Sequence, residues 1–177
     1  LYNLNSAHYF QVTNSGKYYI SSVTGSGIGG SDWCKLLING TDTTAKSLGI
    51  PLNSGTEDLD FFVSKDESFM IVVKYTGNIT KLHISFHNSN GSWTNPKNLG
   101  PMINFGLGMW GPYVSSDNKY LFYTAGTNPN YSDVSIRWVR IDGLIDSLRH
   151  TNFIPYLKNQ IPTLKDTVNV PFNFIIP

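Results

Sequence analysis

The sequence contains one cysteine, few charged residues and no long apolar run, and each shortage excludes a class of protein. Cys34 has no partner for an internal disulfide, and it cannot build a multi-cysteine zinc site. Charged residues make up 14% of the 177 residues and the formal net charge is +1, which provides no basic surface for nucleic acid. Nowhere do 18 apolar residues follow one another, so we expect no membrane span.

The residue patterns of common catalytic and metal sites are also missing. There is no Gly-x-Ser-x-Gly segment, and the glycine-rich stretch 25–30 is expected to link two strands rather than to bind phosphate. His83 and His87 fall on one side of an expected strand, where their separation of about 13 Å is too large for one metal ion. We therefore expect no cofactor and no metal, and we favour a protein that is not an enzyme.

An internal repeat of 51 residues is the strongest signal that the sequence does contain. Each copy reads as strand, polar turn and strand, with Ser15, Asp66 and Asp117 at the turn. Equivalent positions hold Val12, Val63 and Val114, then Tyr18, Phe69 and Tyr120, and then Ile20, Ile71 and Phe122. With 40% apolar residues, the chain is also rich enough to fold as one domain with a core.

The period continues into a second block and predicts the fold class. Residues 48–53 match residues 99–104 at the same spacing, and further strand candidates lie at 32–37, 82–86 and 133–139. Four antiparallel strands in a unit of about 50 residues are typical of one blade of a β-propeller. We therefore predict an all-β protein with about three four-stranded blades. A β-sandwich whose strands are similar by chance is the alternative.

The same residues resemble the blades of the bacterial WD-like (TolB-type) β-propeller repeat family. Segment 112–123, PYVSSDNKYLFY, is similar to the first part of a family blade, and segment 90–104, NGSWTNPKNLGPMIN, is similar to its last part. Segment 83–86 corresponds loosely to the middle part, and segment 136–149 resembles the end of such chains, where the last blade passes into a short helix. The resemblance covers residues 8–149, and it implies a bacterial, extracytoplasmic protein that is periplasmic, surface-bound or secreted.

The repeat also predicts where the units begin and end within one propeller domain. The tail alternates apolar and polar residues over 166–174, so we expect a strand there that completes blade three or pairs with blade one. The predicted units are blade one at 1–54, blade two at 55–105, blade three at 106–149 with a short helix from 142, and the tail at 150–177.

Three blades are too few to close a ring, because propellers have about four to eight. An open set of three blades would expose one apolar face at each end. Either the remaining blades of a six-bladed ring or a second copy related by a two-fold axis would bury these faces. We favour the remaining blades, because the sequence begins at Leu1, a predicted blade boundary, without an initiating Met or a signal segment.

Four residues near the starts of the predicted innermost strands are candidate ligand-binding residues: His8, Asp58, Asp60 and Trp110. Trp110 could stack on a sugar or peptide ring while Asp58 or Asp60 accepts hydrogen bonds, or Trp110 could pack between blades with the carboxylates solvated. We predict a non-catalytic module that binds a protein, peptide or glycan. The alternative is a propeller-type carbohydrate-active hydrolase or lyase that uses Asp58 and Asp60, about 7 Å apart on one strand face.

Overall fold

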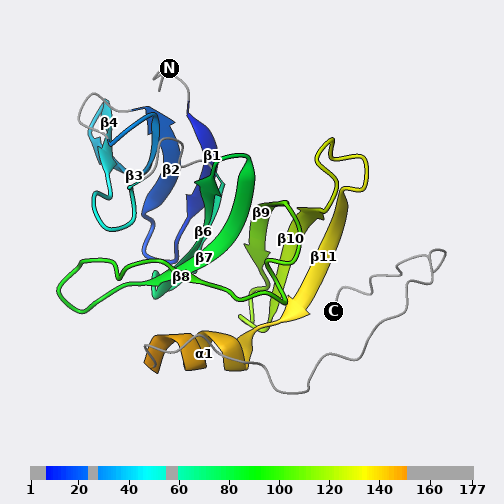
Figure 1. The fold of residues 1–177 in the computed structure, drawn as a ribbon. Helices are drawn as coiled ribbons and strands as arrows, with labels where there is room; N and C mark the ends of the chain where they lie inside the picture. Colours follow the sequence, from blue (N-terminus) through cyan, green and yellow to red (C-terminus); the bar gives the residue numbers. More distant parts are fainter. Residues whose placement is uncertain (1–6, 24–27, 55–59, 151–177) are drawn as a thin grey trace, which may run out of the picture.

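The structure is a computed structural model that describes residues 7–23, 28–54 and 60–150. The protein consists mainly of three antiparallel sheets that follow one another along the chain (Figure 1). This confirms the all-β prediction. Sheet 1 contains β1 (His8–Val12), β2 (Tyr18–Val23), β3 (Ser31–Asn39) and β4 (Asp42–Ser47). Sheet 2 contains β5 (Phe61–Val63), β6 (Phe69–Thr76), β7 (Ile79–Phe86) and β8 (Lys97–Asn98). Sheet 3 contains β9 (Gly108–Val114), β10 (Tyr120–Gly126) and β11 (Ser135–Arg140).

The first hairpin turn has the same backbone conformation in all three sheets. Gly16, Glu67 and Asn118, which are 51 residues apart, have positive φ angles of 75°, 61° and 58°. Each backbone N–H donates to the carbonyl three residues earlier, in Thr13, Ser64 and Ser115 respectively. Glycine and asparagine adopt this left-handed conformation readily, whereas it is uncommon for glutamate. The repeat is therefore a repeat of backbone geometry as well as of sequence.

The second repeated block is an asparagine that bonds to the third strand of its own sheet. The Asn53 amide accepts a hydrogen bond from the backbone N–H of Trp33 (3.0 Å) and donates one to its carbonyl (2.9 Å). Asn104 makes the same pair of bonds to Leu82, at 2.7 and 2.8 Å. Both asparagines are buried. Each satisfies one backbone N–H of the third strand and shares the carbonyl of the same residue with the backbone N–H of Leu48 or Leu99. The repeated asparagine is thus explained by folding alone.

Sheet 2 lies between the other two sheets and is buried on both faces. Its β6 residues Ile71 and Val73 pack on one side against Leu121 and Tyr123 of sheet 3. On the other side, Met70 and Val72 form a second core with Phe61, Val63, Tyr19, Trp33 and Leu52. Each apolar side chain buried in this way contributes about 1.5–3 kcal/mol to folding, so the two cores dominate the stability of the stack.

Sheet 1 departs from the repeat by one residue of strand register. Val12 lies opposite Tyr18 in sheet 1, whereas Val63 lies opposite Met70 in sheet 2. Because side chains alternate between the two faces of a strand, this slip turns Tyr19 toward sheet 2, and not its neighbour Tyr18. The 51-residue spacing matches Tyr18 with Phe69, whose side chain faces the next sheet along the chain. The sequence would therefore predict that Tyr18 faces sheet 2, whereas Tyr19 does.

A short helix, α1 (Asp142–His150), follows β11 and closes the core between sheets 2 and 3 (Figure 1). Leu144, Ile145 and Leu148 are buried in that core. The Nζ atom of Lys97 donates to the carbonyl of Leu148 at 2.6 Å. Sheet 3 has three strands among the described residues, and the strand predicted at 166–174 lies outside them. Within the described ranges, no helix is long and apolar enough to cross a membrane.

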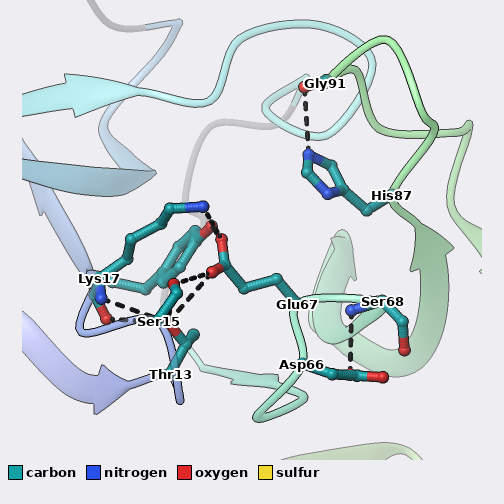
Figure 2. Close-up of polar contacts among 9 residues, drawn as sticks. Thr13, Ser15, Lys17, Asp66, Glu67, Ser68, His87 and Gly91 are labelled. Atoms are coloured by element: carbon teal, nitrogen blue, oxygen red, sulfur yellow. Dashed lines mark hydrogen bonds and ion pairs between the residues drawn. The ribbon is translucent and has the colours of Figure 1, made fainter.

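Glu67 fastens the turn of sheet 2 to the turn of sheet 1 (Figure 2). Its carboxylate is buried and accepts hydrogen bonds from Thr13 (3.2 Å), Ser15, Lys17 (3.0 Å) and Tyr19 (2.8 Å). Burial alone would raise the pKa of Glu67, but the hydrogen bonds and the Lys17 charge outweigh it and lower the pKa from 4.5 to about 2. The left-handed backbone of residue 67 thus places a charged acceptor against four donors of the neighbouring sheet.

We expect Glu67→Gln to destabilise the protein by about 1.5–3 kcal/mol at neutral pH, because it removes charge-assisted hydrogen bonds. Since the folded-state pKa lies below the ordinary value of 4.5, the wild type loses this contribution as the pH falls from about 4.5 toward 2. Urea unfolding at pH 7 and pH 3 should therefore show a smaller pH effect in the variant. Asp42→Asn, at an exposed carboxylate, is the control, and an equal effect in both variants would contradict this account.

Candidate functional site

The structure places three of the four predicted site residues on or beside the first strands of the sheets. His8 is exposed at the start of β1, Asp60 is buried just before β5, and Trp110 is partly buried in β9. Asp58 lies outside the described residues. The Asp60 carboxylate contacts Tyr9 and Gly111, the sequence neighbours of His8 and Trp110. The backbone around three of the predicted positions is therefore brought together, but their side chains do not form one site.

Asp60 connects irregular positions in the first strands of sheets 1 and 3. It accepts a hydrogen bond from the backbone N–H of Gly111 at 2.8 Å, and its charge acts on the phenol of Tyr9. Tyr9 and Gly111 both have positive φ angles, 51° and 54°, and the strand register shifts beside each. Burial, together with the charge of Asp60 and the hydrogen bond to it, raises the pKa of Tyr9 to about 12. The carboxylate thus serves to hold the three first strands together.

Replacing Asp60 should be visible in the titration of Tyr9. We expect Asp60→Asn to lower the pKa of Tyr9 from about 12 toward 10, although burial keeps it above that ordinary value. The measurement is an NMR titration of ring-labelled tyrosine, with Asp42→Asn as the control. An unchanged Tyr9 midpoint in Asp60→Asn would show that this carboxylate does not contact the tyrosine.

An uncharged aromatic cavity of about 630 Å³ lies between sheets 2 and 3, at the end formed by the β6–β7 turn and the β10–β11 loop. The rings of Trp110 and Tyr131 meet edge to face in it, with centroids 5.0 Å apart. Asn78 also lines the cavity, and its backbone carbonyl accepts a hydrogen bond from the Tyr131 hydroxyl at 3.5 Å. The rest of its lining includes Tyr75, Ile79, Thr80, Leu107 and Pro129, and none of the lining residues is charged.

Local backbone interactions hold the cavity walls in place. The Asp133 carboxylate accepts backbone N–H groups of Thr127 (3.0 Å) and Asn128 (3.0 Å), which closes the loop that carries Tyr131. Hydrogen bonds from these two residues, the Thr127 side chain included, lower the pKa of Asp133, so its charge persists at mildly acid pH. The Thr80 hydroxyl accepts the backbone N–H of Met109 at 2.7 Å and joins β7 to β9.

The position of the Trp110 ring depends on a glycine two residues before it. A Cβ atom at Gly108 would lie 1.9 Å from the Cη2 atom of Trp110, a distance that no packed atoms tolerate. Gly108 therefore leaves the room in which the indole ring lies along the cavity wall. Any larger residue at position 108 must displace the ring, which provides a way to disturb the cavity without changing its aromatic groups.

This arrangement is suited to binding an uncharged ligand. A volume of about 630 Å³ is within the range of small-ligand sites, and aromatic walls with a few amide groups suit an uncharged ligand. Sequence reasoning found Trp110 but missed Tyr131 and Asn78, because these lie in loops of different repeats. The loop residues Asn128-Pro129-Asn130-Tyr131, typical of a turn, were the available signal. Comparison with known protein families and with curated proteins finds no match to this chain.

Proposed function

We propose that the protein is a non-catalytic binding module of the β-propeller type, whose three sheets are blades of the 51-residue repeat. Sheets 1 and 2 support this, because each is a four-stranded antiparallel meander with the same turn geometry and the same asparagine block. The resemblance of segment 90–104 to TolB-type blades supports an extracytoplasmic location. The ligand is a protein, peptide or glycan that binds in the cavity of Trp110 and Tyr131.

The aromatic cavity is the observation that carries this proposal. Aromatic faces bind sugar and peptide rings by stacking, while the Asn78 carboxamide supplies a donor and an acceptor for orientation. A hydrolase would need a carboxylate facing the bound ligand, and none of the residues lining the cavity has one. Asp60, which was a candidate for that role, is already occupied by Tyr9 and Gly111.

The test is a binding screen of the whole chain on neutral oligosaccharides and synthetic peptides, followed by calorimetry of any ligand found. We expect Tyr131→Ala to weaken binding at least tenfold, or about 1.4 kcal/mol, because it removes one aromatic wall. Gly108→Ala should weaken binding as well, since it displaces the Trp110 ring. Tyr113→Ala is the matched control, because Tyr113 is an exposed tyrosine outside this cavity.

Two results would contradict the proposal. A ligand that binds both cavity variants with the wild-type Kd would place the binding site elsewhere on the molecule. Turnover of a ligand by the wild-type protein would show that the module is catalytic. Circular dichroism of each variant checks that a loss of binding is not a loss of fold.

A further inference from the structure

The outer face of sheet 3 is apolar and has no neighbouring sheet among the described residues. Strand pairing places Phe122 beside Trp138 and Thr124 beside Ile136 on this face. Ile136 is 78% exposed and Trp138 is 48% exposed. We name this surface the sheet 3 end face, and it consists of Tyr120, Phe122, Thr124, Ile136 and Trp138. Such a face is a candidate interaction surface.

The sheet 3 end face repeats a surface that is buried elsewhere in the same molecule. In sheet 2, the equivalent pairs are Ile71 with Ile84 and Val73 with Leu82, and all four residues are fully buried against sheet 3. Phe122 and Thr124 follow Ile71 and Val73 by one repeat of 51 residues. The outer face of sheet 3 therefore resembles a face that packs on another sheet, although Arg140 has the place of the buried Phe86. No sheet covers it among the described residues.

The outer face of sheet 1 has the complementary character at the other end of the stack. Val12, Tyr18, Leu36 and Ala45 form one row across its four strands. On the same face, Ile38 is 55% exposed and Phe10 is 60% exposed, whereas Ile20 and Cys34 are buried. We name the row of four, together with Ile38 and Phe10, the sheet 1 end face. Phe10 and Val12 precede Phe61 and Val63 by one repeat, and that later pair packs sheet 2 onto sheet 1.

We propose that a second copy of this chain, instead of the remaining blades that the sequence favours, packs the sheet 1 end face against the sheet 3 end face. This contact continues the sheet-on-sheet stacking already present within one chain. The residues of the two end faces are uncharged. Arg140 lies beside Tyr120 on the outer face of sheet 3, and its charge is already paired with Asp142 at 2.9 Å. Each chain carries both halves of this contact, and two copies related by a two-fold axis use all four end faces. The proposal does not depend on the ligand cavity.

The first measurement is the mass of the whole chain by sedimentation equilibrium across micromolar concentrations. We expect a species of twice the 19.8 kDa of one chain. Ile136→Lys disturbs the sheet 3 end face and Ile38→Lys the sheet 1 end face, and each should leave a single chain in solution. Ile50→Lys is the matched control, because Ile50 is 76% exposed and belongs to neither end face. All three positions are exposed, so the substitutions should leave the fold intact.

Mixing the two end-face variants tests the head-to-tail geometry directly. Ile136→Lys retains a wild-type sheet 1 end face and Ile38→Lys a wild-type sheet 3 end face, so the mixture should regain a two-chain species through one intact contact. A two-chain species that survives both substitutions, or a mixture that stays single, would overturn the proposal. So would a single-chain mass for the wild type, which is expected if another segment or a different protein covers the sheet 3 end face.

Discussion

A sheet with two apolar faces needs a neighbour on both sides, and this constraint organises the whole molecule. Sheet 2 meets it within the chain, because one core forms with sheet 1 and the other with sheet 3. Among the described residues, sheets 1 and 3 each pack against a neighbouring sheet on one side only. The clearest result is the contrast between Leu82, which is fully buried, and Ile136, which has the corresponding place in sheet 3 and is 78% exposed.

Polar interactions determine how the sheets are joined once this burial has brought them together. Glu67 joins the turns of sheets 1 and 2, and Asp60 joins the first strands of sheets 1 and 3. Both carboxylates are buried. Glu67 replaces its lost hydration with four donors from sheet 1 and its turn, and Asp60 accepts the backbone N–H of Gly111 in sheet 3. The apolar cores supply most of the stabilising free energy, whereas these carboxylates fix the orientation of one sheet to the next. The aromatic cavity lies in the space that this orientation leaves between sheets 2 and 3.

Much of the fold could be predicted from spacing, because spacing reports local backbone geometry. The aromatic residues Tyr18, Phe69 and Tyr120, which are 51 residues apart, are the first residues of β2, β6 and β10. The one-residue slip of register in sheet 1 could not be predicted, since it depends on how Tyr19 packs against sheet 2. The propeller architecture and the family resemblance stay predictions, because the three sheets do not by themselves determine a closed ring.

The candidate site was less predictable, for a related reason. The repeat correctly predicted that residues 8, 60 and 110 lie on or beside the first strands of the sheets. It did not show which of these side chains form contacts that stabilise the fold. Asp60 is an example, since it accepts a hydrogen bond from Gly111 and raises the pKa of Tyr9, and these two residues come from two other repeats. Tyr131 and Asn78 meet Trp110 only after sheets 2 and 3 have packed together. Contacts of this kind depend on the packed structure and leave no local pattern in the sequence.

Native-state hydrogen exchange tests the central constraint most directly, at a concentration low enough to keep the chain monomeric. If sheet 2 is stabilised by neighbours on both sides, the backbone amides of Ile71, Val72 and Ile84 should exchange most slowly, because they open only when both cores separate. The amides of β2 and β10 should exchange faster, since each of these strands belongs to a sheet with one neighbour. Equal protection in all three sheets, or slower exchange in sheet 3 than in sheet 2, would contradict the account.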